Sequence, residues 1–336
     1  MKTQGSMALS SLASADDWEP TWIWMDGELL PWGSATVHVN AVGHASVAAV
    51  FEGLKAYLAD DGRSLLVFRL QDHIRRLFDS ARLTRLEIPF EPDEIEGAVL
   101  DLLGATNLDC DMYVRPWAFA SGLIREQMVP AGARCTVAVD CWPFTPRLDQ
   151  VGGVDAAVSS WQRISEASMP PRAKAFSNYH NGRLAVMEAR ANGHDWPILL
   201  NDRHKVAEGA GACLALVRNG VLVTPSLSSG VLDSLTRDTA LVLAHSMDIP
   251  VEVREVDRSE LYLAEEIFFL GTAWEILPVT TIDALRVGSG VRGPVATRLA
   301  GAYEDMVRGR SDHSEWITRL DLGSRSAGRN NQRRRT

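Results

Sequence analysis

The sequence predicts an α+β protein built as two lobes, and three observations point to this. Short alternating strand patterns, separated by turn residues, fill most of residues 18–145. After residue 152, strand patterns alternate with helical ones, and 336 residues suffice for about two domains. Between these stretches the pattern breaks at a proline and a Gly-Gly pair. We therefore expect a smaller N-terminal lobe over 18–145, an interdomain loop over 146–152 and a larger C-terminal lobe over 153–322.

The first lobe is expected to begin with a hairpin around Asp26-Gly27, because this dipeptide accepts the positive φ angles of a tight turn. Two helices are expected in the lobe. Residues 70–86 carry apolar side chains every three to four positions, and residues 92–107 open on a proline and acidic residues. The further strands expected are 50–57, 65–68, 112–120 and 134–144.

The second lobe is expected to mix strands and helices. A hairpin over 212–225 should close at Asn219-Gly220, which has the same turn chemistry as the first hairpin. The remaining strands expected are 155–160, 197–201, 251–256, 267–272 and 276–283, and the helices expected are 179–192, 236–248 and 259–266.

Composition and the chain ends bound the classes of function. Residues 1–17 lack the apolar core of a secretory signal, and residues 323–336 are basic, polar and aperiodic, so we expect a disordered leader and a disordered tail. No apolar run reaches the ~18 residues of a membrane span. A net charge of −9 argues against a nucleic-acid surface. The four cysteines lack metal-site spacing. These features favour a cytoplasmic protein without metal, membrane or nucleic-acid partner.

Lys174 is the first candidate for chemistry. It is one of only four lysines in an arginine-rich chain, and it stands between a predicted strand and a predicted helix. A lysine can form a Schiff base with a carbonyl compound or with pyridoxal phosphate, whereas arginine cannot. Most lysines are solvated surface groups, so this position alone is weak evidence.

Three further segments have residue types suited to a flat, phosphorylated ligand. Glu208 is followed by glycines and small residues, which allow close approach of the backbone and supply one carboxylate for a positive partner. Leu235 and Thr236 open a predicted helix, whose N-terminal N–H groups favour anions. Thr272 lies in the segment LGTAWE. Taken singly, each of these also fits an ordinary turn or helix cap.

In their order along the chain, these segments resemble the fold-type IV pyridoxal-phosphate enzymes, and among them the branched-chain amino acid aminotransferases. The resemblance covers roughly residues 18–320. It rests on the segments VFEGLKAY, VFRLQDHIRRLFDSARL, YVRP, KAFSNYHNGRLAVMEARANG, AEGAGA, LTRD, ELYLAEEIFFLGTAWEILPV and VGSGVRGPVATRL. It implies a small N-terminal lobe, a larger cofactor-binding lobe and a homodimer that builds each site with a loop of the second subunit.

The resemblance also assigns the cofactor residues. It implies that Lys174 holds pyridoxal phosphate as a Schiff base and then moves the substrate proton. Glu208 is matched to the pyridine nitrogen and Tyr179 to the phenolic oxygen of the ring. The positions matched to the phosphate are Arg69, Leu235, Thr236 and Thr272.

On the substrate side, the resemblance places Phe51 and Tyr113 in the pocket. Tyr113 and the N–H groups of Thr272 and Ala273 are matched to the substrate α-carboxylate. Arg115 is matched to the group that receives the side-chain carboxylate of glutamate, although a structural ion pair is its alternative role.

The chain departs from the family pattern at three substrate positions. Ser46 stands where the family usually has a tyrosine that reaches the neighbouring subunit's site. Phe144 replaces a second family tyrosine, and Trp274 stands where a small residue usually follows GTA. The cofactor apparatus is thus complete while the residues around the substrate differ.

The implied activity is transamination between an L-amino acid, branched-chain or another apolar or unusual one, and a 2-oxo acid such as 2-oxoglutarate. A lyase resembling aminodeoxychorismate lyase and a D-amino acid transaminase are the alternatives within the same fold. A third alternative is a non-catalytic binding or scaffold protein descended from the enzyme. The retention of Lys174 and Glu208 argues against this alternative.

Overall fold

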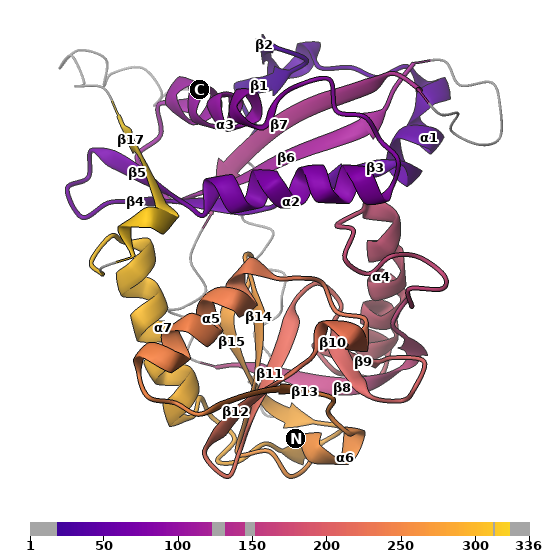
Figure 1. Cartoon of the computed structure of the whole chain (residues 1–336), viewed down its shortest axis with the longest axis vertical. Coiled ribbons are helices and arrows are strands. Elements are labelled where there is room, and N and C mark those ends of the chain that lie inside the picture. The colour runs from indigo at the N-terminus through magenta and orange to yellow at the C-terminus, as the bar shows by residue number, and fades with distance from the viewer. Residues whose placement is uncertain (1–18, 123–131, 145–151, 312, 323–336) are drawn as a thin grey trace, which may run out of the picture.

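The computed structural model describes residues 19–122, 132–144, 152–311 and 313–322. The expected leader, the expected tail and nearly all of the expected interdomain loop lie outside these residues. Two sheets with helices packed on them confirm the α+β class. Figure 1 shows the two lobes one above the other, with α4 and α7 along opposite sides of the lower lobe. No helix in the described ranges is long and apolar enough to cross a membrane.

An antiparallel sheet forms the first lobe. Its order is β17-β5-β4-β6-β7-β1-β2, and β3 also pairs with β6. The β1–β2 turn has the positive φ angles expected of Asp26 (49°) and Gly27 (99°). The strands are β1 (Trp22–Met25), β2 (Glu28–Pro31), β3 (Ala49–Phe51), β4 (Leu54–Leu58), β5 (Ser64–Phe68), β6 (Met112–Ala120), β7 (Cys135–Pro143) and β17 (Ile317–Asp321).

Helices α2 (Leu70–Leu83) and α3 (Pro92–Thr106) pack against this sheet and against each other, and α1 (Val42–Val47) precedes β3. Apolar side chains of α2 and α3 are fully buried in the first core. α2 is shorter than the predicted 70–86 because Arg85 takes a left-handed φ of 60°. α3 starts with a reciprocal capping box between Glu91 and Glu94, which supports the predicted start at Pro92.

A mixed sheet forms the second lobe, in the order β10-β9-β8-β15-β14-β11-β12-β13, with β16 beside β15. The β11–β12 hairpin turns at Asn219 and Gly220 with positive φ angles, as predicted. The strands are β8 (Val154–Gln162), β9 (Trp196–Leu200), β10 (Val206–Gly209), β11 (Cys213–Arg218), β12 (Val221–Pro225), β13 (Val251–Arg254), β14 (Glu266–Gly271), β15 (Glu275–Ile282) and β16 (Leu285–Arg286).

Four α-helices accompany the second sheet. α5 (Leu235–Ser246) and α7 (Pro294–Val307) contact each other and pack on β14, whereas α4 (Phe176–Ala191) packs on β8 and β9. The short α6 (Arg258–Leu261) follows β13. One apolar cluster of the second lobe includes side chains from α5 and α7. A second apolar cluster includes Leu261 of α6. The sheet therefore has cores on both of its faces.

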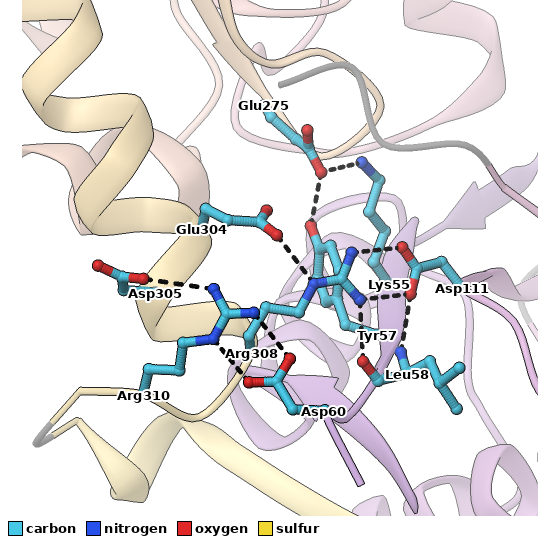
Figure 2. Close-up of polar contacts among 10 residues, drawn as sticks. All are labelled: Lys55, Tyr57, Leu58, Asp60, Asp111, Glu275, Glu304, Asp305, Arg308 and Arg310. Carbon is cyan, nitrogen blue, oxygen red and sulfur yellow. Dashed lines mark hydrogen bonds and ion pairs between the residues drawn. The ribbon is translucent and has the colours of Figure 1, made fainter. Parts of the chain in front are cut away.

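Half-buried and fully buried polar contacts join the lobes. Arg308, just after α7, donates to both carboxylate oxygens of Asp111 at 2.7 and 2.8 Å and to the backbone oxygen of Leu58 at 2.9 Å. Beside it, Glu275 of the second lobe accepts hydrogen bonds from Lys55 and Tyr57 of the first (Figure 2). The lobes are thus held together by charged side chains as well as by the chain connections.

Several predicted bounds differ from the structure for physical reasons. The strand expected over 50–57 is broken into β3 and β4 at Glu52-Gly53, where a Cβ on Gly53 would lie 1.8 Å from the Tyr113 hydroxyl. The helix expected over 179–192 begins earlier, at Phe176. The helix expected over 259–266 ends at Leu261, and Glu266 already belongs to β14.

The largest difference concerns the end of the chain. The predicted C-terminal lobe extends to residue 322, but β17 pairs antiparallel with β5 and so belongs to the first sheet. The predicted boundary is therefore wrong for this strand. Local sequence patterns indicate a strand but not the sheet edge that it joins, and neither α7 nor β17 was predicted as an element.

Candidate active site

A cavity of about 590 Å³ lies between the lobes. Its lining includes the amine of Lys174, the carboxylate of Glu208, the phenol of Tyr179 and the start of a helix at Leu235. The predicted site residues that line it are Phe51, Tyr113, Lys174, Tyr179, Glu208, Leu235, Thr272, Ala273 and Trp274.

Lys174 stands where the two lobes touch through their backbones. Its carbonyl oxygen accepts a hydrogen bond from the Phe51 N–H at 2.9 Å, and Val50 forms an isolated bridge with Ala175. The Lys174 N–H donates to the Ser80 hydroxyl of α2 at 3.0 Å. First-lobe residues therefore fix the backbone from which the lysine side chain enters the cavity.

The Lys174 amine lies against phenolic and aromatic groups. Its Nζ donates to the Tyr179 hydroxyl at 2.7 Å. It also lies 4.9 Å from the ring centroid of Phe51 and 5.1 Å from that of Tyr179. Tyr179 is on the first turns of α4, so the helix that follows the lysine supplies its hydrogen-bond partner.

Glu208, on β10, is a buried carboxylate with several donors. Arg163 Nη2 lies 2.8 Å from its Oε1, and the Leu232 N–H donates to Oε2 at 3.3 Å. The Cys213 thiol lies 3.5 Å from Oε2. Burial raises the pKa of Cys213, and the neighbouring Glu208 adds to the effect, so Cys213 is a neutral thiol. Glu208 is thus held as a fixed acceptor that faces the cavity.

The N-terminus of α5 presents N–H groups at the cavity. Ser234 is its N-cap, and its hydroxyl accepts from the Arg237 N–H at 3.2 Å. Ser234 and Leu235 line the cavity, whereas Thr236 is buried and does not line it. A helix start of this kind favours an anion such as a phosphate.

Arg69 braces this helix start from the first lobe. Its Nη1 donates to the Leu235 backbone oxygen at 3.2 Å, to Asp238 Oδ2 at 2.6 Å and to Thr239 Oγ1 at 3.1 Å. Its Nε bonds Asp72 at 2.6 Å. Arg69 does not itself line the cavity.

Thr272, Ala273 and Trp274 form the tight connection between β14 and β15. Gly271 pairs with Glu275, and the Trp274 N–H donates to the Gly271 oxygen at 3.0 Å. All three residues line the cavity. Trp274 packs on Trp196 of β9, with ring centroids 4.4 Å apart, so its indole adds to the side of the cavity next to β9.

Three predicted substrate residues do not line the cavity of the single chain. Arg115 makes a two-point contact with Asp140, at 3.1 and 2.6 Å. Phe144 lies beside Tyr113, with ring centroids 6.0 Å apart, and does not line the cavity. Ser46 is exposed on α1, where its hydroxyl donates to the Gly43 oxygen.

Sequence reasoning missed several residues of the cavity. Arg163 pairs with Glu208, and Arg76 donates to the Asp233 oxygen at 2.7 Å while lining the cavity. Phe176 also lines it. Arg163 and Arg76 depend on pairings between distant segments, which no local pattern shows. Phe176 was within reach, since it lies two residues after Lys174. Among the described residues, no cluster of His, Cys, Asp or Glu is arranged to hold a metal ion.

Glu52 is expected to make the stability of the protein depend on pH in the acidic range. Burial alone would raise its pKa, but Arg76, which contacts both carboxylate oxygens at 2.7 and 2.8 Å, and His73 outweigh burial and lower the pKa to about 2. Because the pKa of Glu52 is lower in the folded state, its ionised carboxylate stabilises the fold at pH values above 4.5. This stabilisation is lost as the pH falls from 4.5 towards 2. We expect Glu52 to account for a loss of about 3 kcal/mol of unfolding free energy across this interval.

Urea unfolding at several pH values between 5 and 2 would measure this loss, with Glu52→Gln as the comparison. The variant should be less stable at pH 7 and should lose less stability over the acidic interval. Equal acid slopes for both proteins would show that Glu52 does not carry the effect.

Comparison with known proteins places the cavity in context. Residues 49–282 match the family described as amino-transferase class IV. The chain is 36% identical over 304 residues to the branched-chain-amino-acid aminotransferase of Escherichia coli (strain K12), covering 89% of this chain and 97% of that protein.

Solved structures agree. The PLP-form of the branched-chain amino acid aminotransferase from Thermobaculum terrenum has 40% identity and a TM-score of 0.87, covering 90% of this chain and 98% of that one. The branched-chain aminotransferase from Thermoproteus uzoniensis with norvaline has 39% identity and a TM-score of 0.84, covering 89% and 99%. The chain therefore belongs to the class IV aminotransferases, the family of pyridoxal-phosphate-dependent transaminases that includes the branched-chain amino acid aminotransferases.

Proposed function

We propose that this protein transfers an amino group between an L-amino acid with an apolar side chain and a 2-oxo acid such as 2-oxoglutarate, with pyridoxal phosphate held by Lys174 as a Schiff base. One observation carries the proposal. In a chain of this family, the Lys174 amine, its partner Tyr179 and the Glu208–Arg163 pair face one cavity between the lobes.

The donor set of the cavity fits pyridoxal phosphate. The aldehyde needs a primary amine, which Lys174 supplies, and the phenolic oxygen needs a donor, for which Tyr179 is placed. The ring nitrogen needs an acceptor, and Glu208 is one. The N-terminus of α5 at Leu235, which Arg69 braces, suits the phosphate, and Thr236 and Thr272 are proposed to add hydroxyl donors.

The cofactor, when bound, supplies an electron sink for the pair left on Cα after deprotonation. The Lys174 Nζ would be the base that takes the Cα proton and delivers it to the cofactor, so it must work as a neutral amine. Glu208 keeps its orientation through Arg163 and the Leu232 N–H, so its acceptor oxygen does not have to reorient during the reaction.

The substrate α-carboxylate is proposed to bind at the Thr272–Ala273 connection and at Tyr113. Both elements line the cavity. Burial raises the pKa of Tyr113, which therefore stays a neutral hydroxyl donor across the working pH range. Two backbone N–H groups and one hydroxyl orient the carboxylate and so aim Cα at Lys174.

Arg115, which does not line the cavity of the single chain, is proposed to receive the side-chain carboxylate of glutamate where a second subunit completes the site. Asp140 takes two of the five N–H donors of its guanidinium, which leaves others to donate while the ion pair holds the plane in place. The lyase and D-amino acid transaminase alternatives are not favoured, because the relatives that match over most of the chain are named branched-chain aminotransferases.

We further propose a cytoplasmic homodimer. All four cysteines are free thiols, which suits a reducing compartment. Around Ser46, the side chains of Val39, Val42 and Val47 are 81%, 50% and 66% exposed, an apolar surface that a second copy would cover. Light scattering should give twice the 36.8 kDa chain mass. A monomeric mass at micromolar concentration would contradict the dimer.

The activity is tested by mixing the yellow holoenzyme with single L- or D-amino acids and following the visible cofactor band in one half-reaction. L-leucine or L-valine should bleach the band, and 2-oxoglutarate should restore it, whereas D-alanine should leave it unchanged. Repeated turnover that releases pyruvate without an acceptor, with the visible band retained, would instead identify a lyase. A protein that stays colourless with added pyridoxal phosphate would overturn the enzyme assignment.

A further inference from the structure

Two phenylalanine rings stack at the cavity beside Lys174. Phe51, the last residue of β3, and Phe176, the first residue of α4, have ring centroids 4.2 Å apart and an interplanar angle of 28°. Both line the cavity, and one comes from each lobe. Tyr179 meets Phe51 edge-on at 5.0 Å, so three aromatic rings surround the space next to the lysine amine.

The position of this pair relative to Lys174 is fixed by the backbone. The Phe51 N–H donates to the Lys174 oxygen, and the neighbouring Val50 and Ala175 form a bridge. Phe51 and Phe176 therefore emerge from two paired segments, and Phe176 lies two residues after the lysine. The Phe51 ring centroid lies 4.9 Å from Lys174 Nζ. A Cα atom within reach of Nζ therefore lies near the Phe51 ring, on which the Phe176 ring is stacked.

Phe176 is also supported from behind. Its ring meets that of Trp117 at 6.1 Å in an edge-to-face contact, and it packs on a small apolar cluster that includes Ala45 and Ala49. The ring therefore has little room to move away when a ligand enters. Phe176 is half-buried, with one side in this packing and one side lining the cavity.

We propose that Phe176 is a specificity-determining residue of the amino-donor site. Stacked on Phe51, it occupies volume next to the substrate side chain, so the site prefers compact aliphatic side chains to aromatic ones. This inference rests on the transaminase function proposed above. Removing a phenyl ring from a closely packed apolar site opens space for several carbon atoms. Apolar pockets discriminate by roughly 10- to 200-fold over differences of a single methylene.

The test compares Phe176→Ala, Phe176→Leu and the wild-type holoenzyme, each with L-valine and L-phenylalanine in the single half-reaction. We expect the ratio of the kcat/KM for L-phenylalanine to that for L-valine to rise at least about tenfold in Phe176→Ala and less in Phe176→Leu. The visible cofactor band should be unchanged in both variants. Met187→Ala, on the exposed surface of the same helix, is the matched control and should keep the wild-type ratio.

Two results would overturn the proposal. One is a ratio within twofold of the wild-type value in a yellow Phe176→Ala protein. The other is an equal loss of activity towards both donors, which would show that the ring only supports the fold. Neither result would contradict the transaminase function. That function is contradicted only if none of the amino donors bleaches the visible band of the wild-type holoenzyme.

Discussion

Lys174→Arg is expected to lower the rate of transamination by more than about 10³-fold and to leave the purified protein without its visible band. Arginine keeps the positive charge and much of the length of lysine. It cannot condense with an aldehyde, and it does not release a proton at working pH, so both proposed roles of Nζ are lost together. The half-reaction with L-leucine and the absorbance spectrum measure the two losses separately.

Lys205→Ala is the matched control for this change. Lys205 bonds Asp257 in an exposed turn of the second lobe, and a surface pair of this kind contributes little. The variant should keep the colour and the rate of the wild type. If borohydride reduction labels a lysine other than Lys174, the assignment of the cofactor lysine is wrong, whatever the rate of Lys174→Arg.

Lys55→Met is expected to lower the free energy of unfolding by about 3–5 kcal/mol. Lys55 and Glu275 are 2% and 0% exposed, and Lys55 Nζ lies 2.7 Å from Glu275 Oε1. The Tyr57 hydroxyl donates to the same oxygen at 2.8 Å (Figure 2). Removing the Lys55 ammonium leaves the Glu275 carboxylate buried without the positive charge that lies 2.7 Å from it. The backbone of Glu275 has a left-handed φ of 56°.

Urea unfolding of the holoenzyme at one protein concentration measures this change. Arg310→Met is the comparison, since Arg310 pairs with Asp60 at the surface of the same junction between the lobes. Loss of that exposed pair should change the free energy of unfolding little, because solvent screens it. Similar losses in the two variants would show that burial of the Lys55–Glu275 pair does not set its contribution. Because Glu275 follows Trp274 directly, Lys55→Met should also raise the KM for the amino donor.

The sequence predicted those parts of the fold that depend on neighbouring residues. The two tight hairpin turns follow from Asp26-Gly27 and Asn219-Gly220, and the start of α3 follows from a proline after an acidic cap. The strand predicted over 112–120 matches β6. In each case the residues that decide the conformation lie within a few positions of it.

The site could be predicted only in part, for the same reason. The resemblance pointed to Lys174, Tyr179 and Glu208, and the structure brings all three to one cavity. It could not show that Arg163 pairs with Glu208, because the two meet only after β8 and β10 have joined the same sheet. Nor does the pattern around Arg115 show its contact with Asp140, which depends on the register between β6 and β7.

The pairing of β17 with β5 bears on how the chain is made. Ser64 and Asp321, which face each other across these strands, are 257 positions apart. At about 5–20 residues per second, a ribosome needs roughly 10 to 50 s to cover that interval. Throughout it, β5 presents an open strand edge, the kind of surface on which nascent chains associate wrongly. The lobe that leaves the ribosome first is thus the one whose sheet is completed last.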